Sequence, residues 1–93
     1  MGTPEQILED NGYSIEDLKE EETLLFRDPD YHTAIIGISH DGRVIYDYDK
    51  MLDYLVQFED MNYEEAADNI SYNTIRSLTY IDGNKPIIMY SFE

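Results

Sequence analysis

The sequence predicts an α+β fold, a small and mainly antiparallel sheet with helices packed on one face. Three observations predict it. Apolar residues recur at helical spacing in several segments. A β-branched, alternating run with a central turn indicates a hairpin, and a further apolar run near the C-terminus indicates one more strand. At 93 residues the chain suffices for one core, so we expect a single domain over 1–93.

The first elements are short helices. Thr3 is a predicted N-cap, followed by proline at the first helical position and by Gln6 three residues on. Gly12 is expected to end that helix. Ser14 offers a second cap shortly afterwards. The segment 1–22 is therefore expected to hold one or two short helices.

The hairpin is the clearest element of the sequence. Residues 32–39 alternate and are rich in β-branched side chains, which favours a strand. His40-Asp41-Gly42 is a turn signal, and residues 43–48 form the predicted return strand. We therefore expect two antiparallel strands joined by a tight turn.

Two helices are expected after the hairpin. Asp49 is the predicted N-cap of the first. Asn62 and Glu65 form a capping pair for the second. Near 72–74 the apolar pattern shifts phase, which predicts a kink or a fresh short helix capped by Asn73. The first helix is expected to bury one apolar stripe, formed by Met51, Leu52, Leu55 and Phe58.

A final strand is expected at 86–90, after a turn at 82–84. Its run of Ile87, Ile88, Met89 and Tyr90 has apolar side chains at both odd and even positions. Successive side chains of a strand point to opposite faces. This strand is therefore able to pack on both of its faces.

Charge and cysteine usage exclude several classes of function. The 21 acidic residues outnumber six Lys and Arg, which gives a net charge of −15 and a pI near 4.1. Phosphates would be repelled, so direct binding to nucleic acid or to an anionic membrane is not expected. The absence of cysteine removes disulfides and thiolate-bound metals. With no leader or long apolar run, we expect a cytoplasmic protein.

Catalysis and cofactors have little support. Paired carboxylates of the glycosidase type arise by chance among 21 acids, and a domain of this size has little room for a cleft. His32 and His40 fall at opposite ends of the hairpin. Alternate carboxylates at 28–30 and 47–49 lack the remaining EF-hand ligands. We expect a non-enzymatic protein without a metal or cofactor.

The negative charge is the main functional signal. Acids lie on helix faces opposite the apolar stripes, with tyrosines among them. Carboxylates spaced by roughly 6 to 7 Å imitate a row of duplex phosphates and would be steered to a basic, nucleic-acid-binding groove. This hypothesis makes the protein an inhibitor that mimics nucleic acid. The predicted partner-binding residues are Asp49, Asp53, Tyr54, Glu59, Asp60, Glu64, Glu65 and Asp68.

Besides a small hydrolase that uses carboxylates, which ranks lowest, two alternatives stay open at this stage. In the first, the chain is a small structural or regulatory module that forms a homodimer through exposed strand edges. Its motivation is the Tyr and Ile content of the predicted strands. In the second, the acidic surface only keeps the protein soluble.

Three segments of the second half resemble a known group of proteins. They are Tyr63-Glu64-Glu65-Ala66, Tyr72-Asn73-Thr74-Ile75-Arg76 and Pro86-Ile87-Ile88-Met89-Tyr90. The pattern resembles a family of short, uncharacterised proteins of Gram-positive, gut-type bacteria and their phages or mobile elements. The family has proline where this chain has Thr79. The resemblance implies a mobile-element context, in which small acidic proteins are similar in style to inhibitors of host defence nucleases, including anti-CRISPR proteins.

Overall fold

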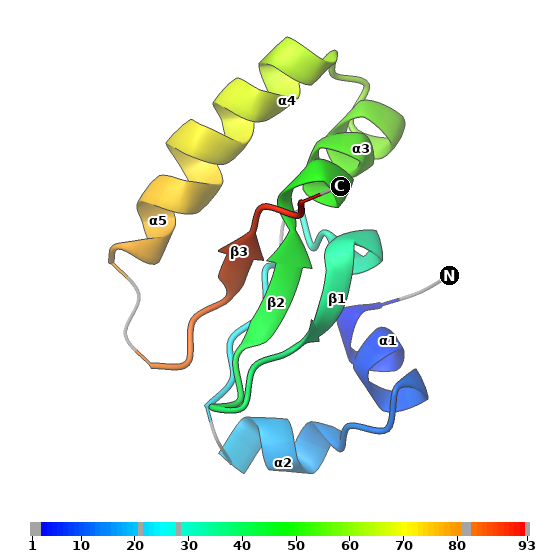
Figure 1. Ribbon diagram of the computed structural model, residues 1–93, viewed down its shortest axis with the longest axis vertical. Helices are drawn as coiled ribbons and strands as arrows, with labels where there is room; N and C mark the ends of the chain where they lie inside the picture. The colour runs from blue at the N-terminus through cyan, green and yellow to red at the C-terminus, as the bar shows by residue number, and fades with distance from the viewer. Residues whose placement is uncertain (1–2, 21, 28, 81–82, 93) are drawn as a thin grey trace.

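The computed structural model describes residues 3–20, 22–27, 29–80 and 83–92 (Figure 1). The predicted α+β class is confirmed, with a hairpin, a C-terminal strand and helices. The elements in chain order are α1 (Pro4–Asp10), α2 (Ile15–Glu20), the 3₁₀ helix η1 (His32–Ala34), β1 (Ile35–Ile38), β2 (Val44–Asp47), α3 (Tyr48–Phe58), α4 (Tyr63–Asn69), the π-helical η2 (Ile70–Ile75), α5 (Arg76–Leu78) and β3 (Ile87–Met89).

The sheet has the strand order β1-β2-β3. β1 and β2 form the predicted antiparallel hairpin, and Gly42 takes the positive φ that its tight turn requires. β3 runs parallel to β2, with Ile45 opposite Ile87. The parallel direction follows from the connection, because α3, α4, η2 and α5 return the chain to the starting end of β2. In Figure 1, none of the described helices crosses in front of the strands.

The helices pack on one face of the sheet, and the hydrophobic core lies between that face and the helices. Val44 and Tyr46 point into it from β2, and neither has exposed surface. Leu8 and Leu18 enter from the N-terminal helices, so both halves of the chain contribute. The fully buried side chains of largest volume are Tyr31, Tyr46, Leu8, Met51, Leu55, Ile70 and Val44.

Two buried tyrosines organise the centre of this core. The ring of Phe26 lies 4.7 Å from that of Tyr46 and 5.6 Å from that of Tyr31, measured between centroids. The hydroxyl of Tyr46 accepts a hydrogen bond from the backbone N–H of Phe26 at 3.2 Å, and the hydroxyl of Tyr31 pairs with that of Thr74 at 3.2 Å. Burial raises the pKa of Tyr46 to about 12. Both phenols are therefore buried, neutral and hydrogen-bonded at neutral pH.

The predicted first strand begins later than expected. Residues 32–34, predicted as strand, form η1, and β1 starts at Ile35. Two local features explain the difference. Tyr31 adopts a left-handed conformation with φ of 49°, and the side chain of Asp30 accepts a hydrogen bond from the backbone N–H of His32 at 3.1 Å. Together they turn the chain sharply and delay the extended conformation.

The cap of α3 differs from the prediction by two residues. Asp47 is the N-cap, and its Oδ1 accepts from the backbone N–H groups of Asp49 and Lys50 at 2.9 and 3.3 Å. Asp49 lies inside the first turn, where a carboxylate still stabilises the positive end of the helix dipole. Within the predicted stripe, Met51 and Leu55 are buried, whereas Phe58 is half exposed.

The helices after α3 confirm one prediction and refine another. Asn62 and Glu65 form a complete capping box at the start of α4. The phase shift near 72–74 corresponds to η2, a π-helical stretch that continues α4 into α5 without a break. Asn73 lies inside this stretch and caps no new helix. The predicted turn at 82–84 begins outside the described residues.

We predict that Asn62→Ala lowers the free energy of unfolding by about 1 kcal/mol, because the first turn of α4 loses its capping acceptor. Asn73→Ala is the matched control, since Asn73 is exposed and caps nothing, and a change within about 0.5 kcal/mol is expected. Urea denaturation followed by circular dichroism measures both. Equal losses in the two variants would contradict the assigned helix starts.

Candidate protein-binding surface

All seven predicted partner-binding acids lie on α3, α4 and the loop between them. The two helices pack against each other, and the hydroxyl of Tyr63 on α4 donates to Oδ1 of Asp53 on α3 at 2.8 Å. This hydrogen bond raises the pKa of Tyr63. Asp49 and Asp68 both lie near Tyr48, whose pKa is raised by burial first, then by Tyr90 and these two carboxylates. Asp49, Asp53 and Asp68 thus lie close to the contact between α3 and α4.

The remaining predicted acids lie at the end of α3, in the loop after it and in the first turn of α4. Glu59 is the C-cap of α3, and Asp60 follows it with a positive φ of 57°. Glu65 accepts from the backbone N–H of Asn62 in the capping box. All of the predicted carboxylates are exposed, including Glu64 in the first turn of α4. They are spread over residues 49–68, around the corner between α3 and α4.

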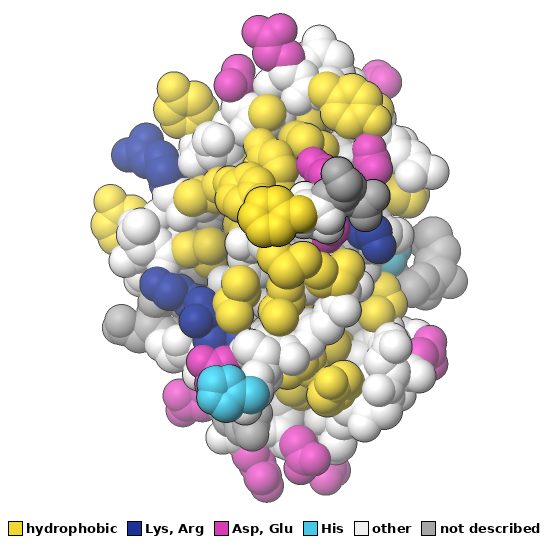
Figure 2. All heavy atoms as spheres, viewed as in Figure 1, with side chains coloured by type: hydrophobic (Ala, Val, Ile, Leu, Met, Phe, Trp, Pro, Cys, Tyr) yellow, Lys and Arg dark blue, Asp and Glu magenta, His cyan; other side chains and the backbone are white. Residues whose placement is uncertain are grey.

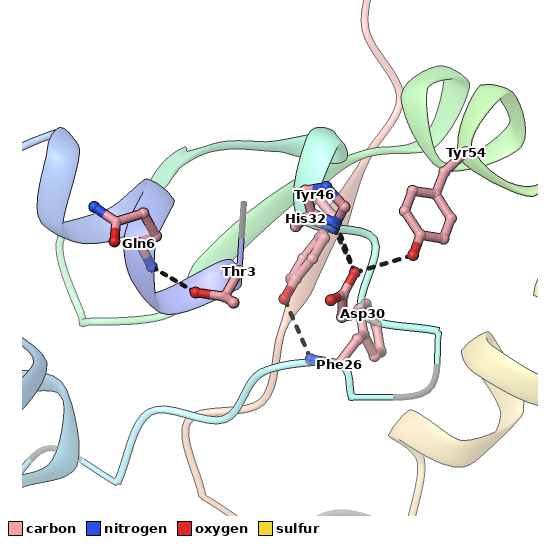
Figure 3. A network of polar contacts seen from close by, with 7 residues as sticks. All are labelled: Thr3, Gln6, Phe26, Asp30, His32, Tyr46 and Tyr54. Atoms are coloured by element: carbon pink, nitrogen blue, oxygen red, sulfur yellow. Dashed lines mark hydrogen bonds and ion pairs between the residues drawn. The ribbon is translucent and has the colours of Figure 1, made fainter. Parts of the chain in front are cut away.

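Tyr54 is separated from these acids by its contacts inside the fold (Figure 3). Its hydroxyl donates to Oδ1 of Asp30 at 3.2 Å, and its ring lies 5.4 Å from that of Tyr31. Burial and the negative charge of Asp30 raise the pKa of Tyr54 to about 12. Tyr54 therefore ties α3 to the segment before η1, a contact that sequence spacing did not indicate.

Asp30 is the centre of that polar network. Its Oδ1 also accepts from the backbone N–H of His32 at 3.1 Å and pairs with Nδ1 of the same residue at 2.9 Å. Burial alone would raise the pKa of Asp30, but its hydrogen bonds and its charge interaction with His32 lower it overall. The network has the residue types of an acid–base site. Three polar groups of His32 and Tyr54 converge on the single oxygen Oδ1 of Asp30, which is the arrangement of a structural tie.

Neither a metal centre nor a paired-histidine site is found in the described ranges. No group of three or more His, Asp or Glu among them is placed to hold a metal ion. Asp47 and Asp30, which belong to the two alternate-carboxylate motifs, are used as a helix cap and in the polar network. His32 lies in η1, whereas His40 lies at the exposed hairpin turn.

The structure adds a surface that the sequence analysis did not single out. The face of the sheet turned away from the core carries Ile45, Ile87 and Met89, and Ile36 lies beside them at the bulge of β1; we call this surface the open sheet face. None of these four residues packs with the core cluster, and Ile36 and Met89 are 40% and 38% exposed. Figure 2 shows apolar side chains gathered over the strands on this side of the molecule. The signal was present in the doubled isoleucine 87–88, which places one apolar side chain on each face.

Comparison with known proteins gives no match among protein-family models, curated proteins or solved structures. Among the described helices, none combines the length and the apolar character that crossing a membrane requires.

We predict a pH-dependent contribution of Asp30 to stability. A folded-state pKa below the unfolded value stabilises the fold at neutral pH, and this stabilisation is lost as the pH falls through the lowered folded-state pKa. The difference in unfolding free energy between the wild type and Asp30→Asn should therefore be constant above about pH 5 and shrink below about pH 4. Urea titrations at several pH values measure it.

Glu9→Gln is the control for that prediction, because it removes one negative charge from an exposed helix position. Its difference from the wild type should show no loss of stabilisation on acidification. A wild-type advantage over Asp30→Asn that persists unchanged at pH 3 would show that the carboxylate form of Asp30 adds nothing to the network.

Proposed function

We propose that the protein is a non-enzymatic, cytoplasmic binding protein whose acidic surface engages a basic protein partner. The partner class is a nucleic-acid-binding protein, such as a host defence nuclease, whose cationic groove the acids of α3 and α4 occupy in place of nucleic acid. Binding would block that groove, and the protein would act as an inhibitor.

The observation that carries this proposal is the unneutralised charge. The sequence has 21 acids and six Lys and Arg. Within the described ranges, the ion pairs are Arg27 with Glu5 and His32 with Asp30. Nearly all of the remaining described carboxylates are exposed. Self-repulsion of this size destabilises a small domain, so a surface that retains it favours a function for the charge.

The environment of the acids supports a protein partner over a metal ion. Asp53 accepts from the hydroxyl of Tyr63 at the contact between α3 and α4, and the charges of Asp49 and Asp68 act on Tyr48. Exposed tyrosines supply contact area at low entropic cost, and Tyr63 and Tyr72 are 58% and 67% exposed. Charge would then set the rate of encounter with a basic partner, and the aromatic rings would lengthen the lifetime of the complex.

The homodimeric module is the alternative function, and the open sheet face is the observation in its favour. Each copy would bring a net charge of −15 to the other. Charge of that size keeps proteins apart in solution. We therefore rank a basic partner above a second copy.

We predict that the immobilised protein retains a basic, nucleic-acid-binding protein from a bacterial lysate, and that both duplex DNA and about 1 M salt release it. Mass spectrometry identifies what elutes. A partner released by neither treatment would contradict charge-driven mimicry.

The purified partner then allows a matched comparison of two surfaces. Neutralising Asp49, Asp53, Glu64 and Asp68 together, as Asn or Gln, should weaken binding by about tenfold or more at low salt and flatten its salt dependence. The control neutralises Glu9, Asp10, Glu16 and Asp17 on α1 and α2, an equal change in charge. Equal weakening by both sets would show that binding depends on net charge alone and not on the acids of α3 and α4.

A further inference from the structure

The open sheet face is an apolar surface without a covering layer among the described residues. Ile45 lies on the central strand with Ile87 directly beside it, while Ile36 and Met89 lie on the two outer strands. Sheets of α+β proteins bury one face against helices, as β1–β3 do here, and a second apolar face normally needs a second layer. Beyond β3 the chain exposes two more aromatic rings, those of Tyr90 and Phe92, which are 61% and 101% exposed.

The size of the open sheet face fits one α-helix. Three strands spaced by about 4.8 Å give a surface roughly 14 Å wide, and strands of three or four residues are roughly 10 to 13 Å long. A helix with its side chains is about 10 to 12 Å in diameter. One helix of two to three turns would therefore cover the four apolar side chains, whereas a second sheet would overhang them.

The charge around the open sheet face favours a cationic helix. In Figure 2, acidic side chains lie around the apolar band at the top, at the bottom and on one side, and basic side chains lie between them on both flanks. At the α3 end, Asp49 and Asp68 lie near Tyr48, whose ring lies 4.8 Å from that of Tyr90. An occupant with Lys or Arg beside its apolar stripe would meet opposite charges there.

Two of the basic residues, Arg43 just before β2 and Lys85 just before β3, make contacts within the chain. Arg43 donates through Nε to the backbone oxygen of Lys85 at 2.8 Å, and Lys85 donates through Nζ to that of Leu78 at 3.1 Å. They help to hold β3 next to β2 and α5. In a homodimer formed through this face, most of the acidic border of one copy would lie against the same acids of the other. Repulsion between the two borders disfavours self-association.

We propose that the open sheet face binds a basic amphipathic helix, with its apolar stripe on Ile36, Ile45, Ile87 and Met89 and its Lys or Arg toward the acidic border. This inference rests on the proposed function, because it names the part of a basic partner that the protein contacts. It adds an apolar anchor to an interaction that charge alone would leave weak at physiological salt.

The test uses three synthetic peptides of about 18 residues, long enough for five turns of helix. The first has Leu on one face and Lys on the other, the second scrambles that order, and the third replaces Lys by Glu. Fluorescence anisotropy at about 150 mM salt measures binding, and methyl NMR of the isoleucines locates it. We expect the amphipathic Lys peptide to bind at least about tenfold more tightly than the others and to shift the signals of Ile36, Ile45 and Ile87.

Variants of the protein separate the open sheet face from charge in general. Ile36→Lys and Met89→Lys should each weaken binding of the amphipathic Lys peptide by about tenfold, because a cation replaces an apolar contact. Tyr72→Lys adds the same charge at an exposed position on η2, and less than about a twofold change is expected. Circular dichroism confirms that each variant is folded. Because the two variants are on different strands, the test still works if one of them does not fold.

Each remaining outcome is decisive. Equal binding of the scrambled Lys peptide, or shifts confined to α3 and α4, would overturn this inference and leave the proposed function standing. Binding of the Glu peptide would remove the role of charge at this face. No binding by either Lys peptide would overturn the inference, and loss of the lysate partner would separately overturn the proposed function. A dimer in sedimentation that Ile36→Lys dissociates would assign the face to a second copy.

Discussion

The fold depends on the burial of β2, the central strand of a very small sheet. Tyr46 and Val44 fill the space between this strand and the helices with no exposed surface. The strand tolerates a buried phenol because the N–H of Phe26 donates to it. A chain of this size buries only about 60% of its unfolded surface, so few other contacts are available to offset the repulsion among its acids.

The two faces of the same strand then have different consequences. The core face orders the molecule, since aromatic rings from 26, 31 and 46 meet there and α3 packs over them. The opposite face is apolar as well, yet the described residues leave it uncovered. An acidic border makes it a poor surface for self-association and a good one for a cationic partner. Charge and apolar contact thus belong to one binding surface in this proposal, with charge attracting the partner and the strands retaining it.

Features that depend only on neighbouring residues could be predicted from the sequence. The capping box at Asn62 and the hairpin turn at Gly42 are fixed by neighbouring residues, and both were predictable. The N-cap of α3 was predicted two residues too late because Asp47 and Asp49 are equally good caps. The choice between them depends on where the strand ends. Tyr54 was assigned to the surface because its bond to Asp30 joins residues far apart in sequence. The open sheet face was missed because an apolar strand looks the same whether one or both of its faces are covered.

The π-helical stretch of η2 has a consequence for how this chain tolerates insertion and deletion. A π turn holds one residue more than an α turn, and such turns commonly stand where a single residue has been added to a helix. Removing one residue between 70 and 75 would let this stretch relax to an α-helix, and the helix after it would keep its orientation because the π turn already holds the extra residue. Ile70 and Thr74, both buried, would then lie three or four positions apart and still share one face. A single deletion should therefore be tolerated better here than inside α3, where it would rotate the following residues by about 100°.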